Sequence, residues 1–292
     1  YAEVVLAVRY RRRAADGTFY GGPMYYIRAL GRGFAPLARI FALLGALAAF
    51  GIGNMVQANT AAEAAAFSLT ALFPALTEAP LRLFVGLLLS LTVALALAGG
   101  AARIGMALAV VFLRLPAAVR ALGNIVTAAF SPRAALGGAA GVGLQTALRC
   151  GMERGMFSHE AGMGSAPIAH AGAQTDDPDR QGLFGIFEVF ADTIVICTLT
   201  ALAILASGVP VPYGRAAGAE LTIAAMGTVF GDGLAAFLTS VCLVLFALST
   251  MLSWSLYGER CFAYLTGGHA AALYRAAFIA AIVLGATMRM EA

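Results

Sequence analysis

Polar side chains interrupt three apolar stretches of the sequence, and these are the residues that could bind a ligand. In residues 50–60, FGIGNMVQANT, Asn54 and Gln57 are three apart and therefore share one face of a helix. An amide surrounded by hydrocarbon must find a partner or a water-filled cavity. The spacing leaves two interpretations open, which are contact with a substrate or ion and hydrogen bonding between helices.

The second stretch, residues 151–170 (GMERGMFSHEAGMGSAPIAH), combines four glycines and a proline with ionisable side chains. In a continuous helix each glycine costs about 1 kcal/mol relative to alanine, and buried charges add to that cost unless they are paired. Transporters use broken helices of this kind to free backbone groups for a ligand. We predict a helix interruption between Ser158 and Gly164, with the backbone near Gly162 available to substrate. A re-entrant or surface loop is the alternative.

The third stretch is a cluster of hydroxyl side chains in the apolar run 234–256. Ser249 and Thr250 belong to this cluster, and polar groups at membrane depth need a partner or a water-filled cavity. Trp254, the only tryptophan, follows Thr250 by four residues, so both lie on one helix face. A bulky aromatic side chain there can cap a small pocket and exclude larger substrates. The predicted interruption should face Gln57 and Thr250.

Known enzyme motifs do not fit the polar residues. His159-Glu160 is not followed by the second histidine of a zinc-binding H-E-x-x-H pair, and Ser165 lacks a surrounding G-x-S-x-G. The sequence contains no P-loop and no G-x-G-x-x-G motif. We therefore predict that the protein is not an enzyme and has no cofactor, and an intramembrane enzyme or channel is the weakest alternative.

Composition points to a membrane protein. Of 292 residues, 61% are apolar and 12% charged, which excludes most soluble globular domains because these are about a quarter charged. The 19 basic residues are all arginine and are scattered, and the net charge is only +4, so a nucleic-acid partner has no support. At roughly 20 residues per crossing, the length predicts several spanning helices in a lipid bilayer.

The fold class that follows is an all-α polytopic membrane protein. Apolar runs predict membrane spans at residues 36–66, 81–102, 104–128, 185–208, 234–256 and 270–288. The third of these is compromised because Arg114, Pro116 and Arg120 lie inside it. Four arginines within residues 9–13 predict a cytoplasmic loop. In residues 18–27 two glycines and a proline precede a span, which predicts an interfacial turn with tyrosine anchors.

Five ordered blocks resemble the signature motifs of the alanine/glycine:cation symporter family. They are GGPMYYI at 21–27, FGIGNMVQANT at 50–60, RGMFSHEAGMGSAPIAHAGA at 154–173, QGLFGIFEVFADTIVICTLTAL at 181–202 and FALSTMLSWSLYGERC at 246–261. The resemblance implies a symporter of the bacterial or archaeal plasma (inner) membrane that takes up L-alanine, glycine or a similar amino acid with Na⁺ or H⁺. It also implies a leucine-transporter-like inverted repeat of five plus five helices.

The resemblance assigns roles to individual positions. Residues 154–173 match the unwound, broken sixth core helix. The residues that would line the amino-acid pocket are Gln57, Phe157, Thr250 and Trp254, with Gly162 in the unwound backbone. Ser249 and Thr250 would bind the coupling ion Na⁺, which is the only metal implied.

The chain also departs from the family pattern. We expect residues 1–292 to form a single transmembrane transporter domain that lacks the first core helices and the C-terminal helix or helices of an incomplete inverted-repeat bundle. His159 stands where the family has asparagine. A truncated, non-transporting remnant of such a symporter is therefore the second interpretation.

Overall fold

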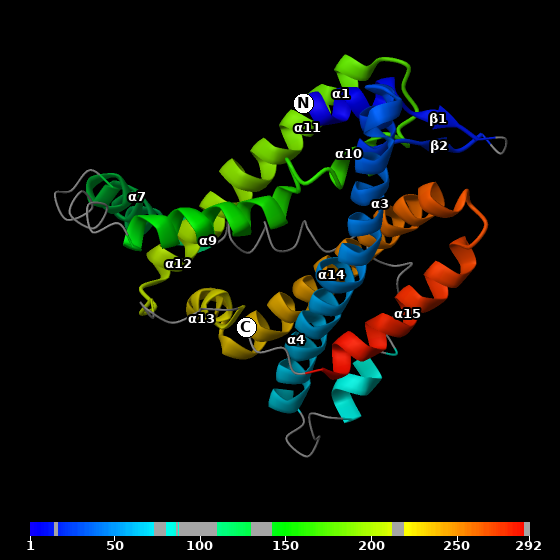
Figure 1. Cartoon of the computed structure of the whole chain (residues 1–292). Helices are drawn as coiled ribbons and strands as arrows, with labels where there is room; N and C mark the ends of the chain where they lie inside the picture. The colour runs from blue at the N-terminus through cyan, green and yellow to red at the C-terminus, as the bar shows by residue number, and fades with distance from the viewer. Residues whose placement is uncertain are drawn as a thin grey trace. The chain divides into compact units, whose positions relative to one another are not determined.

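Helices dominate the computed structural model (Figure 1). It describes residues 1–14, 17–72, 80–85, 87, 110–129, 142–211 and 219–288. The chain divides into two compact units. The first unit comprises residues 1–100, 161–187 and 240–292, and the second comprises residues 101–160 and 188–239.

Short elements open the first unit. Helix α1 (Ala2–Arg9) leads into an antiparallel hairpin in which β1 (Arg12–Arg13) pairs with β2 (Phe19–Tyr20). Helix α2 (Pro23–Ala29) begins with proline at its first turn, where the missing N–H costs nothing. A 3₁₀ turn, η1 (Arg32–Phe34), then joins α2 to the first long apolar helix.

That apolar helix is built from three consecutive segments. Helix α3 (Ala35–Phe50) passes through a π-helical turn, η2 (Gly51–Met55), into α4 (Val56–Leu72), drawn in blue to cyan in Figure 1. The range Arg32–Ala66 is long and apolar enough to cross a membrane, which confirms the span predicted at residues 36–66. The π turn occupies the FGIGNMVQANT block, and such turns occur frequently at functional sites.

The first unit also contains most of α14 and all of α15. Helix α14 (Asp232–Thr266) is long and apolar enough to span a membrane and extends ten residues beyond the predicted run 234–256. Helix α15 (Ala271–Thr287) matches the run predicted at 270–288, although it is shorter than the spanning candidates. The span predicted at 81–102 lies almost entirely outside the described residues.

The second unit contains most of the remaining helices. It holds α7 (Leu115–Ala129), α9 (Val142–His159), the π-helical η4 (Phe190–Cys197), α12 (Thr198–Ser207) and α13 (Ala219–Phe230). Helix α11 (Pro178–Val189) is continuous with η4 and α12, and Pro178–Ser207 is the third spanning candidate within the described ranges. It contains the span predicted at 185–208 except for the final glycine.

Arg114, one of the two arginines in the run 104–128, bonds to the ends of two helices. Its guanidinium donates to the Ser207 carbonyl at 3.1 Å and to the Thr228 carbonyl at 3.4 Å. Both acceptors lie at the C-terminal ends of helices, α12 and α13, where carbonyls lack helical partners. The Arg114 guanidinium, which would be costly in a membrane without partners, therefore donates hydrogen bonds to carbonyls at the ends of two helices.

Small and large side chains divide the surface of α3. Ala38, Ala42, Ala46 and Ala49 are buried, whereas Leu37, Ile40, Leu43, Leu44 and Leu47 are exposed. In water this arrangement would be inverted, because large apolar side chains gain most from burial. In a membrane it is favourable, since small residues let helices approach closely while large ones contact lipid.

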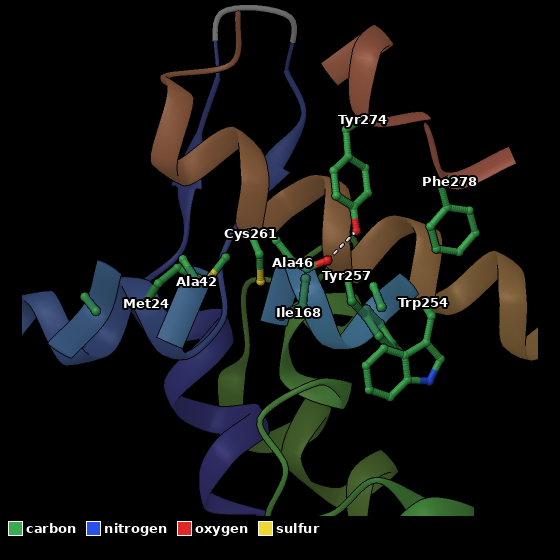
Figure 2. Packing of buried hydrophobic residues seen from close by; sticks show 11 residues of the cluster. Met24, Ala42, Ala46, Ile168, Trp254, Tyr257, Cys261, Tyr274 and Phe278 are labelled. Carbon is green, nitrogen blue, oxygen red and sulfur yellow. Dashed lines mark hydrogen bonds between the residues drawn. The ribbon is translucent and has the colours of Figure 1, made fainter. Parts of the chain in front are cut away.

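Close approaches fix α14 antiparallel against this helix. A Cβ at Gly45 would lie 2.8 Å from the Cys261 Sγ, and one at Gly258 would lie 2.8 Å from the Ala49 Cβ. Farther along, the indole of Trp254 packs so closely on Gly53 that a Cβ at this position would collide with it. The buried cluster that results includes Tyr274 of α15, whose hydroxyl donates to the Ala46 carbonyl at 2.9 Å (Figure 2).

Gly258→Ala tests this packing. The new Cβ would collide with the Tyr274 hydroxyl, so we expect the free energy of unfolding in detergent to fall by about 1–3 kcal/mol. The control is Gly51→Ala, because a Cβ at Gly51 meets no atom within 4 Å. Equal unfolding free energies for the two variants would contradict the close approach.

Candidate functional site

The chain leaves helical geometry in the most glycine-rich of the signature blocks. Helix α9 ends at His159, and α10 (Ala166–His170) begins seven residues later. In between, Glu160, Gly162 and Gly164 have positive φ angles of 54°, 86° and 77°. Glycine adopts this left-handed region readily, whereas a residue with a Cβ does so at a cost. The stretch overlaps the interval from residue 158 to 164 in which the sequence predicted an interruption.

Glu3 partners the most exposed glycine of this turn. The Gly162 N–H donates to the Glu3 Oε2 at 3.2 Å, which joins the turn to α1. Gly162 lies in open space, since a Cβ built on it would meet no atom within 4 Å. Position 162 therefore favours glycine because of its positive φ angle, and not because a side chain would collide with a neighbour.

Arg11 binds the chain that follows α10. Its guanidinium donates to the carbonyls of Ala171 at 3.1 Å and Ala173 at 2.6 Å, and also to that of Thr175. The same group stacks on the Phe19 ring, 3.7 Å from its centroid. One of the four arginines that predicted a cytoplasmic loop thus has a structural task, which is to satisfy the carbonyls at the end of a helix.

The GGP block packs directly against the turn. Gly22, with φ 117°, precedes α2, and a Cβ there would come within 2.7 Å of the Ile168 side chain. A Cβ at Gly164 would in turn lie 2.7 Å from Pro23 and 3.0 Å from Phe41. The sequence predicted an interfacial turn with tyrosine anchors here, and in the structure Gly22 and Pro23 of this turn are buried. Two signature blocks 140 residues apart therefore form one packed structure.

A cavity of about 240 Å³ lies beside this structure. It is lined by Phe41, Leu44, Gly45, Ala48, Met163, Ser165, Ile168, Trp254, Tyr257 and Cys261. The cavity is smaller than the ~300–1,000 Å³ typical of sites for drug-sized ligands, so its volume suits a small solute. Ser165, at the end of the turn, contributes an aliphatic hydroxyl group to the lining of this cavity.

Trp254 forms one wall of the cavity. The side chain is 6% exposed and packs over Gly53 of the π turn. Its ring meets that of Tyr257 edge-on at 5.7 Å between centroids, and Figure 2 shows both beside Ile168. Trp254 therefore joins the π turn, α14 and the glycine-rich turn around one space.

Gln57 and Thr250 lie farther along the same helix pair. Gln57 is about one turn beyond Gly53, and Thr250 is one turn before Trp254, so the antiparallel register places them at a similar level. Both are half-buried. The Thr250 hydroxyl donates to the Phe246 carbonyl at 3.0 Å, which leaves its oxygen lone pairs available.

Of the predicted site residues, Trp254 is among those that line the cavity, and Gln57 and Thr250 are not. Ser249 is exposed on α14, and Gly162 is on the turn without lining the cavity. Phe157 is on α9 in the second unit, with an exposed side chain. Its assignment to the pocket stays a prediction.

Asn54 forms a hydrogen bond between helices, which is one of the alternatives that the sequence left open. Its Nδ2 donates to the Phe278 carbonyl of α15 at 2.6 Å. Asn59 Nδ2 donates to the carbonyl of Met288, directly after α15, at 2.5 Å. The buried Oδ1 of Asn54 receives no hydrogen bond from the described residues. Spacing alone could not have distinguished this role from ligand binding.

Comparison with known proteins identifies the family. The profile that describes the sodium:alanine symporter family matches residues 1–292. The chain belongs to this family. It is 39% identical to the sodium/alanine symporter AgcS of Methanococcus maripaludis over 98% of this chain and 65% of the relative. It is also 39% identical to an uncharacterized transporter of Haemophilus influenzae, over 100% of this chain and 65% of the relative.

Another relative has a different name and a similar extent. The chain is 34% identical to the probable sodium/glutamine symporter GlnT of Bacillus subtilis, over 100% of this chain and 61% of GlnT. The chain thus spans less than two thirds of the length of these sodium:alanine symporter family members.

Arg11→Gln tests the support of α10. Loss of the guanidinium leaves three carbonyls without their charged donor, so we expect amide hydrogen exchange in residues 168–175 to accelerate about tenfold or more. Arg13→Gln is the matched control, because it removes the same charge. The Arg13 guanidinium also lies over the Phe19 ring, 5.6 Å from its centroid. Unchanged exchange in Arg11→Gln would show that α10 is held by packing alone.

Proposed function

We propose that the complete protein is a secondary active symporter that takes up L-alanine or glycine with Na⁺ across a bacterial or archaeal plasma membrane. The observation that carries the proposal is the match of the whole chain to the sodium:alanine symporter family. Relatives named for sodium/alanine and for sodium/glutamine symport support Na⁺ as the coupling ion more firmly than they support one substrate. Spanning helices within the described residues support a multi-pass membrane protein.

We assign the amino acid to the cavity beside Trp254. The cavity volume suits a small amino acid, and we expect the indole wall to limit the length of its side chain. Backbone groups of residues 160–164 lie outside regular helix, so N–H groups can donate to the substrate carboxylate and carbonyls can accept from its ammonium. In this proposal the turn is the unwound part of the sixth core helix of a leucine-transporter-like fold.

We assign Na⁺ to the neighbouring turn of α14. The Thr250 hydroxyl already donates its proton to the Phe246 carbonyl, so its oxygen can accept a cation without a change of rotamer. Ser249 and carbonyls from other segments would complete the ligand shell. Coupling follows from proximity, because a cation that fixes α14 at Thr250 also fixes Trp254 one turn away.

Trp254→Leu tests the substrate site. A shorter wall should admit leucine or methionine while weakening competition by alanine, measured as the ranking of amino acids against labelled alanine uptake in vesicles of the complete protein. Phe278→Leu is the control, because Phe278 is buried in the same cluster but does not line the cavity. If both variants keep the original ranking, Trp254 serves packing and the assignment fails.

Thr250→Val tests the cation site. The side chain keeps its shape and loses its oxygen, so we expect the Na⁺ concentration for half-maximal alanine uptake to rise about tenfold. Thr266→Val removes an equivalent hydrogen bond on the same helix, from the Thr266 hydroxyl to the Phe262 carbonyl at 2.9 Å. An unaltered Na⁺ dependence in Thr250→Val, or the same rise in Thr266→Val, would remove Thr250 from the ligand set.

A further inference from the structure

A second, larger pocket lies where α14 ends in the first unit. Its volume is about 540 Å³, and it is lined by Arg12, Ala14, Tyr20, Tyr25, Arg28, Arg39, Ala263, Tyr264, Leu265, Gly267 and Gly268. The three arginines come from three different elements, β1, α2 and α3. Among the described residues, the lining of this pocket includes no carboxylate and shares no member with the cavity beside Trp254.

Positive charge gathers around one phenol in this pocket. Burial raises the pKa of Tyr25, while the nearby guanidinium groups of Arg12 and Arg260 act in the opposite direction. Tyr25 therefore stays protonated at neutral pH and remains a donor. Arg260 lies over the Tyr20 ring at 4.0 Å, and Tyr264 meets Tyr25 edge-on at 5.3 Å.

Three arginines of the lining have no anionic partner in the part of the chain that the structure describes. Among the residues that the structure describes, none of Arg12, Arg28 and Arg39 forms an ion pair with a carboxylate, and all three are exposed. Guanidinium groups held near one another repel, and a bound anion relieves that repulsion. A planar guanidinium also suits phosphate oxygens, which it binds with two parallel hydrogen bonds.

The pocket lies near the ends of two spanning candidates. Helix α14 ends at Thr266, between the lining residues Leu265 and Gly267, and Arg39 is near the start of the spanning range Arg32–Ala66. One turn beyond Arg39 on the same face of α3, Leu43 is 51% exposed. A ligand that joins a phosphate to a hydrocarbon chain would contact both Arg39 and Leu43, whereas a soluble anion would contact only the arginine.

We propose that this pocket binds the headgroup of an anionic phospholipid, with its phosphate between Arg28 and Arg39 and its acyl chain along the leucine face of α3. The arginine-rich loop places the pocket on the side of the membrane that the sequence predicts to be cytoplasmic. Lipid bound there would join α2, α3 and the end of α14, the elements that surround the glycine-rich turn and Trp254. The proposal does not depend on transport, because it concerns binding alone.

Native mass spectrometry of the purified protein in detergent, titrated with phosphatidylglycerol, tests it. Each arginine near an anionic headgroup changes affinity about fivefold, so Arg28→Gln/Arg39→Gln should weaken binding about twentyfold. The control double variant Arg9→Gln/Arg32→Gln removes the same charge from exposed arginines outside the lining and should change affinity by less than about fivefold. Phosphatidylcholine should bind at least tenfold more weakly than phosphatidylglycerol.

Three results would overturn the proposal. Equal losses in the two double variants would reduce the effect to net charge, and equal affinity for the two lipids would remove the anionic preference. Displacement of phosphatidylglycerol by millimolar inorganic phosphate would indicate a site for a soluble anion. If the double variant misfolds, Tyr25→Phe preserves the ring contact with Tyr264 and removes one donor, and it must still weaken binding measurably.

Discussion

Close packing of small residues between α3 and α14 is the constraint on which the rest of the first unit depends. Water drives large apolar side chains into a core, but lipid is as apolar as leucine, so helices in a bilayer associate through van der Waals contact and hydrogen bonds. The alanine face of α3 and the glycines at positions 45, 53 and 258 provide that contact. Buried polar groups then join α15 to the same helix, since Asn54 of η2 donates to the Phe278 carbonyl and Tyr274 donates to the Ala46 carbonyl of α3.

The same packing builds the candidate site. Because Gly53 has no side chain, Trp254 settles on the π turn and becomes a wall of the cavity. Because Gly164 has none, Pro23 and Phe41 press against the turn that supplies Met163 and Ser165 to that cavity. Sequence blocks that are far apart in the chain are therefore connected by positions where a Cβ would not fit.

Patterns of neighbouring residues in the sequence predicted secondary structure. Apolar runs identified the helices at 36–66, 234–256 and 270–288. The glycine-rich stretch in which the sequence predicted an interruption contains the positive φ angles of Glu160, Gly162 and Gly164. Arg11 and Arg114 could not be interpreted in the same way. Their acceptors are carbonyls more than 90 residues away in the sequence. The sequence therefore showed that each position is charged, but it could not show which helix ends accept hydrogen bonds from it.

The amide side chains show the same limit. Asn54 and Gln57 look equivalent by spacing, yet only Asn54 faces a carbonyl of α15. The buried position of the GGP block also depended on a distant glycine, Gly164, and nothing near residues 21–27 indicated it. Tertiary contacts between signature blocks, more than propensity, decide which of these polar and glycine positions form the site.

The most direct test is an experimental structure of the complete protein with L-alanine and Na⁺ bound. The account predicts density for the amino acid in the cavity between Trp254 and the turn at residues 160–165, within hydrogen-bonding reach of backbone groups there. An amino acid bound elsewhere, with the indole of Trp254 still packed on Gly53 and that cavity empty, would contradict the assignment.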